Sequence, residues 1–369
     1  MNILTTYLAE EALHINGIWI KGDKMMNIDD GKKIFECNAG SHLYGTNTEL
    51  SDIDIRGVFI ASKKYYFGFE HIEQFESKGE NDIVLYELRK FFRLCLDNNP
   101  NIVELLFVPE SRSIVHSDIW KNIISNYELF ISKKARYTFS GYAFSQLKRI
   151  KSHRSWLLNP PKNQPSRKDF GLPENKSLIT KDQLGAFNKL LSMYLDDIKQ
   201  FHPLKEQLDE MNETKNFLGI VQSKLPDSDC LKSLLPVDDN FIEAIQREKQ
   251  FLQANREWNQ YVNWKKNRNP ERAALEEKYG FDTNHGSHLY RLITEGEELL
   301  LTGKITFPRP DKDMLLDIKC GKYSYDNLMN IVGDIDLRFN ELYEKSTLPH
   351  KSDYNKVNEL CIKIIERNL

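Results

Sequence analysis

Several patterns that would place this sequence in a familiar class are missing from it. The five cysteines are scattered and form no C-x-x-C pair, which argues against a disulfide framework and against a cysteine-based zinc site. No apolar run approaches the roughly 20 residues of a membrane-spanning helix. Lys and Arg number 51 against 54 Asp and Glu, so any contact with nucleic acid must come from a local basic patch.

Glycine-based and serine-based signatures are missing as well. The 18 glycines show neither G-x-G-x-x-G nor Walker spacing, which argues against Rossmann and P-loop nucleotide sites. There is no G-x-S-x-G motif of a serine hydrolase. The first residues carry no basic flank before an apolar run, so we expect no signal peptide and a cytoplasmic protein with reduced thiols.

What is present predicts an α+β protein. Three stretches have strand character, at residues 32–38, 52–61 and 82–86, and the last runs into a helix that stops near residue 97. We therefore expect an N-terminal α/β domain, a mixed sheet with helices, over residues 1–130. Residues 131–369 should be a mainly helical domain that closes the cleft, interrupted by a proline-rich loop at 159–177. Its helices are expected near 126–158, 181–201, 240–266, 270–279, 286–302, 311–318 and 324–345.

The stretch "SDIDIRGVF" places two carboxylates at the start of a strand. Because side chains alternate along a strand, Asp52, Asp54 and Arg56 should share one face, while Ile53 and Ile55 point into the core. Two unpaired carboxylates this close disfavour each other's ionisation. A divalent cation removes that penalty, and carboxylate oxygens suit Mg²⁺ bound together with substrate phosphates. The pair therefore predicts a metal site.

A Gly-Ser turn precedes the two aspartates. Gly40 lets the backbone approach a ligand closely, and backbone N–H groups with the Ser41 hydroxyl can hold phosphate oxygens. A phosphate cradle beside metal-binding carboxylates predicts a nucleotide-transfer site. A lone D-x-D is more often a turn or a solvated edge, so the order of the features carries this prediction.

That order resembles a known signature. "GSHLYGTNTELSDIDIRGVF" fits G-S-x(10)-D-x-D followed by a hydrophobic strand, which is similar to the DNA polymerase β-type nucleotidyltransferase superfamily. It most resembles the bacterial and phage branch of predicted nucleotidyltransferases associated with RNA ligase and RNA repair. Later stretches also resemble blocks of that branch, so the likeness covers most of the chain: "ELRKFFRLCLDNNPNIVELLF", "SGYAFSQLKRIKSHRSWLLNPP", "WKKNRNPERAALEEKYGFDT" and "HGSHLYRLITEGEELLLTGKI".

The resemblance implies an enzyme that moves a nucleoside monophosphate from an NTP to an acceptor hydroxyl and releases pyrophosphate, with Mg²⁺ or Mn²⁺ as cofactor. It also implies a third carboxylate on a neighbouring strand, placed to activate the acceptor. Asp82 opens such a strand and is preferred, while Glu87, where the strand becomes helix, is the alternative. The nucleotide would be held by residues of the motif: Gly40, Ser41, Ser51 and Arg56.

Further candidates for substrate binding lie on two expected helices. Tyr142, Gln146, Arg149 and His153 fall on one face of the first, with Lys148 and Lys151 nearby. That face could follow an RNA backbone, or it could be an ordinary solvated basic face. "WKKNRNPER" offers a second cluster of aromatic and basic side chains.

"HGSHLYR" places His285, His288 and Arg291 on the second expected helix. H-x-x-H is a zinc-like spacing, but no third ligand stands at matching distance in the sequence. In the related branch a lysine often stands where this chain has Asn284. His288 and Arg291 keep the pattern and could contact the triphosphate, with packing as the alternative.

Three acceptors or roles stay open at this level. The enzyme could modify an RNA end, could transfer AMP to a protein or small molecule, or could be a non-catalytic RNA-binding relative. We expect an NTP substrate, an RNA acceptor and no membrane partner.

Overall fold

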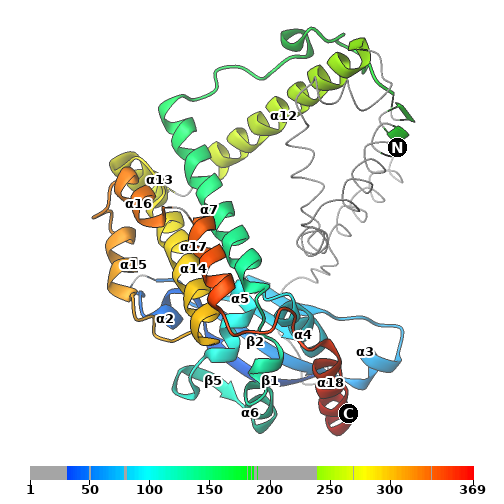
Figure 1. Ribbon diagram of the computed structural model, residues 1–369, viewed down its shortest axis with the longest axis vertical. Coiled ribbons are helices and arrows are strands. Elements are labelled where there is room, and N and C mark those ends of the chain that lie inside the picture. The colour runs from blue at the N-terminus through cyan, green and yellow to red at the C-terminus, as the bar shows by residue number, and fades with distance from the viewer. Residues whose placement is uncertain are drawn as a thin grey trace. The chain divides into compact units, whose positions relative to one another are not determined.

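We describe the protein from a computed structural model (Figure 1). It describes residues 31–49, 51–78, 81–180, 239–268, 270–333 and 335–369, together with a few positions between 182 and 189. The chain divides into two compact units. The first contains Met1–Leu158 and Pro270–Leu369, and the second contains Asn159–Asn269. The second unit is thus inserted between two halves of the first.

The first unit is built on a five-stranded mixed sheet. Its strand order is β3-β4-β2-β1-β5, and only β2 and β4 run parallel. The strands are β1 (Gly31–Asn38), β2 (Asp54–Ala61), β3 (Gln74–Lys78), β4 (Asp82–Glu87) and β5 (Ser113–His116). Because β2 and β4 are parallel neighbours, their N-terminal ends meet at one edge of the sheet. Asp54 pairs with Asp82 there.

The N-terminal half also contributes helices to the first unit. They are α2 (Gly40–Tyr44), α3 (Lys63–Phe67), α4 (Leu88–Leu96), α5 (Pro100–Val103), α6 (Asp118–Ile124) and α7 (Ala135–Leu158), with short 3-10 turns at Glu104–Phe107, Glu110–Arg112 and Tyr127–Leu129. Apolar residues of β1 and α4 enter one large core, in which Phe35 stacks on Trp120 at 4.1 Å between ring centroids. A smaller apolar cluster around Phe59 and Leu85 lies apart from that core, against Tyr65 and Phe75.

The C-terminal half adds six helices to the same core. They are α13 (Pro270–Tyr279), α14 (Thr283–Thr302), α15 (Lys312–Lys319), α16 (Tyr325–Val332), α17 (Ile335–Lys345) and α18 (Tyr354–Asn368). The buried helix α14 packs along α7, and Gly296 permits the contact, since a Cβ there would stand 2.8 Å from Phe139 and Phe339 atoms. Residues far apart in the sequence therefore share one hydrophobic interior.

The second unit contains α12 (Asp239–Asn267) and a loop that carries the 3-10 turn Arg167–Phe170. Arg167 fastens this loop to α12. Its guanidinium donates to both carboxylate oxygens of Glu248, at 2.6 and 3.0 Å, and to the carbonyl oxygen of Pro173. The backbone N–H of Leu178 also donates to Glu248.

The predicted fold class is confirmed: a mixed sheet with helices comes first and a mainly helical region follows. Several details differ. The second strand begins at Asp54 and leaves Ile53 39% exposed outside the core. The segment after residue 39 contains the short helix α2, and β5, α6 and α18 were not predicted. The helix expected at 181–201 and the residues before 31 lie outside the described residues, apart from scattered positions up to 189. The domain boundary at residue 130 stays a prediction.

Among the described residues, no helix is both long and apolar enough to cross a membrane.

Asn98 connects the end of α4 with the C-terminal part of the first unit. It is fully buried and has a positive φ of 50°. Its side-chain amide donates to the carbonyl oxygens of Cys95 and Phe130, and its Oδ1 accepts from the backbone N–H of Ser132 at 3.0 Å. Ser352 adds a further contact at 3.3 Å.

We expect Asn98→Ala to lower the free energy of unfolding by about 2–4 kcal/mol, because buried partners lose their hydrogen bonds and alanine resists a positive φ. Asn98→Gly should recover about 1 kcal/mol of this loss, since glycine accepts the backbone conformation. Urea denaturation monitored by circular dichroism would measure both. A value for Asn98→Ala within the error of the wild type would show that the network contributes nothing.

Candidate active site at the aspartate edge of the sheet

Three carboxylates gather at the N-terminal ends of β2 and β4. Asp54 and Asp82 occupy paired positions in the parallel ladder, so their side chains leave the sheet on the same side. Asp52 is exposed in the segment just before β2. Neighbouring strands lie about 4.8 Å apart, which brings the carboxylates close enough to share a ligand. The structure therefore joins two residues that are 28 positions apart in the sequence.

Arg56 stands between two of these carboxylates. Its Nη2 lies 3.3 Å from Asp82 Oδ2 and 3.7 Å from Asp54 Oδ1, and its Nη1 donates to the carbonyl oxygen of Asp82 at 2.9 Å. The guanidinium offsets part of the repulsion within the acidic cluster. Because these contacts orient Asp54 and Asp82, Arg56 helps to position the carboxylates.

The negative charge of the aspartate cluster is only partly neutralised by its neighbours, as the pKa of Asp54 indicates. Its pKa is raised above the usual value, first because the carboxyl is partly buried and then because Asp82 and Asp52 repel its negative charge. Arg56 and His42 lower that pKa without cancelling the rise. Carboxylates that disfavour one another's ionisation in this way form a donor set that fits a divalent cation with oxygen ligands.

Gly40 lies directly against this cluster. It begins α2 with a φ of +58°, and a Cβ atom there would stand 2.7 Å from Asp54 Oδ2. The backbone N–H of Ala39 donates to the carbonyl oxygen of Asp54 at 2.7 Å and ties the turn to β2. Ser41 follows, half-buried at the start of the helix. Glycine is needed here both for the backbone conformation and for the space beside the carboxylate.

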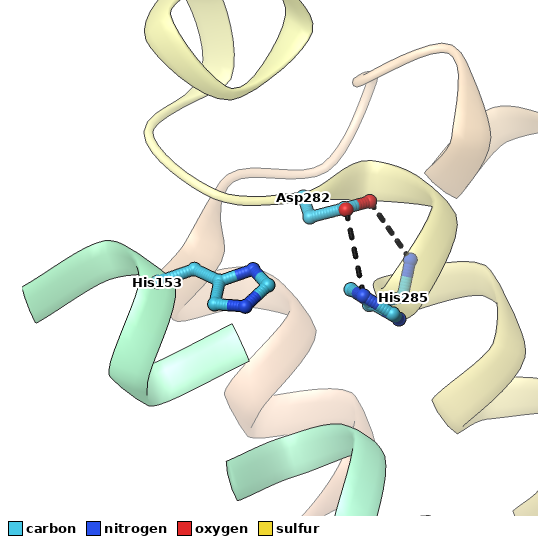
Figure 2. Close-up of side chains that lie close together, drawn as sticks. All are labelled: His153, Asp282 and His285. Carbon is cyan, nitrogen blue, oxygen red and sulfur yellow. Dashed lines mark hydrogen bonds and ion pairs between the residues drawn. The ribbon is translucent and has the colours of Figure 1, made fainter. Parts of the chain in front are cut away.

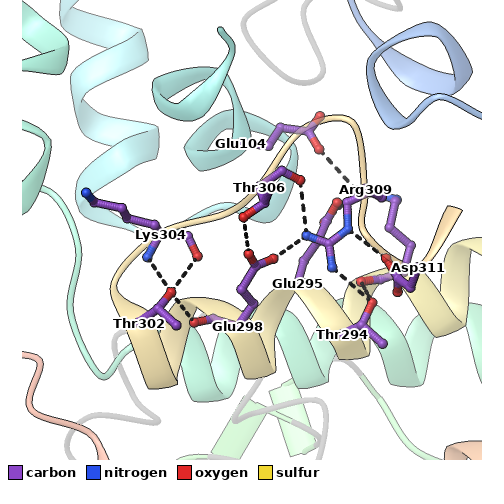
Figure 3. A network of polar contacts seen from close by, with 10 residues as sticks. Glu104, Thr294, Glu295, Glu298, Thr302, Lys304, Thr306, Arg309 and Asp311 are labelled. Carbon is purple, nitrogen blue, oxygen red and sulfur yellow. Dashed lines mark hydrogen bonds and ion pairs between the residues drawn. The ribbon is translucent and has the colours of Figure 1, made fainter.

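A network of buried charged side chains contacts Tyr44, the last residue of α2. The Tyr44 hydroxyl donates to Glu104 at 3.0 Å, and Arg291 from α14 lies over the Tyr44 ring at 4.4 Å. Arg291 Nη1 contacts both Glu104 Oε2, at 3.1 Å, and Glu295 Oε2, at 2.8 Å. Arg309 extends the network, because it contacts Glu298 of α14 and, at 3.1 Å, Asp311 (Figure 3). The interior of the first unit thus holds the Gly-Ser turn in place.

The other predicted site residues lie in varied surroundings. Ser51 Oγ accepts from the backbone N–H of Thr48 at 2.8 Å and closes the loop before β2. Glu87 is buried at the opposite end of β4, where it caps α4 through Arg89 N–H and accepts from the Tyr66 hydroxyl at 2.6 Å. Glu87 lies five positions after Asp82 along the strand, or roughly 17 Å away. The structure brings Asp82 to the cluster and leaves Glu87 apart from it.

The substrate-binding candidates on α7 and α14 also separate from one another. The Tyr142 hydroxyl accepts from Asn99 Nδ2 at 2.8 Å, and Arg149 is exposed. Gln146 and His153 turn toward His285. His288 is exposed on α14, while Arg291 is 5% exposed and belongs to the buried network.

The sequence analysis did not predict two groups of side chains that the structure brings together. The pairing of Arg291 with Glu104 joins positions 187 residues apart, and His285 meets His153 and Asp282. Only the short spacing from Asp282 to His285 is visible in the chain itself. The remaining partners come from other elements of the fold.

The N-terminal part of the chain is similar in sequence to one known protein family. Residues 22–158 match the sequence model of the RNA repair pathway DNA polymerase beta family. The resemblance predicted from the motif is thereby confirmed for the segment that carries the sheet and the aspartates. Residues 22–158 are therefore similar to DNA polymerase β-type proteins associated with RNA repair.

Two curated relatives are similar to this chain. An uncharacterised 38.9 kDa protein of Enterobacteria phage T4, from the nrdC-mobD intergenic region, is 22% identical over 323 residues, which cover 82% of this chain and 87% of the phage protein. The uncharacterised protein YcgL of Bacillus subtilis (strain 168) is 30% identical over 78 residues, 20% of this chain and 30% of that protein. No solved structure matches the chain.

The buried network generates a pH-dependent stability. Burial raises the pKa of Glu295 to about 8; the Arg291 guanidinium lowers it, and the Glu104 carboxylate raises it further. The folded protein therefore retains a proton that the unfolded chain releases near the ordinary value of 4.5. Stability contributed by this group is complete below that value and falls as the pH rises toward 8.

We expect Glu295→Gln to flatten the decline in unfolding free energy between pH 5 and 8, whose slope for one proton is at most about 1.4 kcal/mol per pH unit. Thermal unfolding of wild type and variant across this range provides the measurement. Glu341→Gln, at an exposed carboxylate on α17, is the matched control and should leave the slope unchanged. Parallel curves for wild type and Glu295→Gln would contradict the proposed protonation of Glu295.

Proposed function

We propose that this protein transfers a nucleoside monophosphate from an NTP to an acceptor hydroxyl at an RNA end and releases pyrophosphate. The observation that carries the proposal is the parallel register that sets Asp54 beside Asp82, with Gly40 against the Asp54 carboxylate. The matched family supports the nucleotidyltransferase class and an RNA-repair context. An adenylated protein or small molecule is the rival product.

In the proposed site Asp52, Asp54 and Asp82 are the ligands of Mg²⁺ or Mn²⁺. When bound, the metal neutralises charge on the phosphates and on the attacking and leaving oxygens. Asp82 is the more exposed of the two carboxylates that contact Arg56. It accepts the proton of the acceptor hydroxyl. The hydroxyl oxygen forms a bond to the α-phosphorus, and the bond from that phosphorus to the bridging oxygen of pyrophosphate breaks.

Gly40 and Ser41 are proposed to hold the triphosphate. The backbone of the turn is available beside Asp54 because Gly40 has no side chain, and the Ser41 hydroxyl offers a donor to a phosphate oxygen. Arg56 orients Asp54 and Asp82 through its contacts with both carboxylates. In this proposal Ser51 and Arg291 act through the loop and the buried network that position the site.

An RNA acceptor is favoured by a surface hollow in the second unit. The hollow has a volume of about 390 Å³ and lies along α12, where Trp258, Val262, Lys265 and Lys266 recur at helical spacing. Tyr261 packs beside Trp258 at 5.8 Å between ring centroids. Aromatic faces stack on bases without sequence preference, and lysines neutralise the phosphates between them. Lys148 and Arg149 on α7 provide exposed positive charge in the first unit.

If the three aspartates bind the metal, replacing any one of them with a neutral residue should abolish nucleotide transfer. Asp52→Asn, Asp54→Asn and Asp82→Asn should each abolish incorporation of label from α-labelled NTP in the presence of Mg²⁺, without loss of thermal stability. Glu87→Gln is the control that separates the two candidate third carboxylates: it should destabilise the fold, since Glu87 caps α4 from a buried position, while the folded fraction stays active. Activity above a few per cent in Asp54→Asn would overturn the assignment.

Gly40→Ala tests the phosphate turn. The added methyl group would meet Asp54 Oδ2 at 2.7 Å and requires an unfavourable φ of +58°. We expect a rise in KM for NTP and a fall in kcat together, with a loss of stability of about 1–2 kcal/mol. Gly141→Ala on α7 is the matched control, because a Cβ there has nothing within 4 Å. Equal kinetics for the two variants would show that the turn has no part in nucleotide binding.

If the acceptor is RNA, the affinity of the protein for RNA should fall as the salt concentration rises. For single strands log K should fall with log[salt] at a slope of about −0.7 per phosphate contact. The double variant Lys265→Ala, Lys266→Ala should reduce this slope by the equivalent of one to two phosphate contacts. The double variant Lys148→Ala, Arg149→Ala tests the exposed face of α7 in the same way. Trp258→Ala should weaken binding roughly 10-fold without changing the slope, since stacking carries no charge. Salt-independent binding would favour a protein or small-molecule acceptor.

A further inference from the structure

Two histidines and one aspartate form a second group of potential metal ligands (Figure 2). His153 comes from α7, Asp282 precedes α14, and His285 is in the first turn of α14. One ligand atom from each of these three side chains lies within 4.8 Å of the others. All three residues belong to the first unit.

Hydrogen bonds already orient two of these side chains. His285 Nδ1 donates to Gln146 Oε1 at 2.9 Å, which leaves the lone pair on Nε2, and this Nε2 lies 3.6 Å from Asp282 Oδ2. Asp282 Oδ1 accepts from the backbone N–H of His285 at 3.0 Å, so that Oδ2 is the oxygen left to face the ring. A histidine whose second nitrogen donates to a fixed oxygen is the usual arrangement around a bound metal.

The spacing of these atoms suits a tetrahedral ion. With metal–ligand bonds of 2.0–2.2 Å, neighbouring ligands of a tetrahedral site lie about 3.3–3.5 Å apart. The 3.6 Å between His285 and Asp282 is close to this value, and His153 completes a set of two imidazoles and one carboxylate. Imidazole and carboxylate ligands suit zinc and related first-row ions. We propose that His153, Asp282 and His285 bind a single Zn²⁺.

The surroundings support a buried structural site. Glu276, only 2% exposed, places Oε1 3.5 Å from His153 Nδ1 and adds a second carboxylate beside the cluster. Two carboxylates with two neutral imidazoles balance the charge of a divalent ion. Arg154, the residue after His153, donates to the carbonyl oxygen of Gly280 and lies over the Tyr325 ring.

The position of the site in the chain indicates its role. His153 stands just before the chain leaves the first unit at Leu158, and Asp282 comes soon after it re-enters at Pro270. The ion would therefore fasten together the two segments that bracket the inserted unit. The three proposed zinc ligands are not residues of the proposed nucleotide site, so the zinc proposal does not depend on the nucleotide proposal.

The test uses the full chain after removal of bound metal with a chelator. The Asp54→Asn variant serves as the background, which weakens competing binding at the aspartates. We expect Zn²⁺ titrated by calorimetry to bind with one ion per chain, and Co²⁺ to give the visible absorption of a tetrahedral site with nitrogen ligands. Zinc should also raise the melting temperature in this background.

Variants locate the ion. His153→Gln and His285→Gln should abolish the Co²⁺ spectrum, and Gln146→Leu, which keeps every ligand, should weaken Zn²⁺ binding roughly 10- to 100-fold. His288→Gln, at an exposed histidine on the same helix, is the matched control and should bind normally. If a ligand variant does not fold, Gln146→Leu still decides. Zinc affinity unchanged in Gln146→Leu or His285→Gln, or no binding in the Asp54→Asn background, would overturn the proposal, and neither result requires NTP or activity.

Discussion

The arrangement of the first unit depends most on the contacts of one buried side chain, Arg291. It comes from α14, yet it compensates Glu104 in the N-terminal half and lies over Tyr44 of α2. Removal of one partner from a buried ion pair typically costs 3–5 kcal/mol, because the remaining charge stays desolvated. The helix that carries Gly40 is therefore held by a residue far beyond the segment that matches the family.

This dependence explains how the unit is organised. The family match ends at residue 158, but the core around the sheet also contains apolar residues of α14, α16 and α17. A chain cut at residue 158 would leave that core uncovered and Glu104 without Arg291. The inserted second unit interrupts the sequence of the first, and the proposed zinc site lies where the chain leaves and returns.

The aspartate cluster depends on a different constraint, the parallel pairing of β2 with β4. A parallel pair needs a crossover between its strands, and here α3 and β3 lie between them in the sequence. The register then places Asp82 beside Asp54 and sends Glu87 to the far end, into the cap of α4. A shift of one residue would turn Asp82 to the other face of the sheet. The choice between two candidate carboxylates is thus a matter of strand register.

The sequence by itself determined the fold class, the strands β1, β2 and β4, the long helix α7 and the Gly-Ser…Asp-x-Asp motif. These features depend on local periodicity and on close spacing, which a chain displays directly. The tertiary structure alone decided which distant side chains meet: Asp82 with Asp54, Arg291 with Glu104, and His153 with Asp282 and His285. It also decided that Arg291 is interior and that Ile53 is exposed. Such contacts follow from strand register and helix packing, which bring together residues that no local pattern relates.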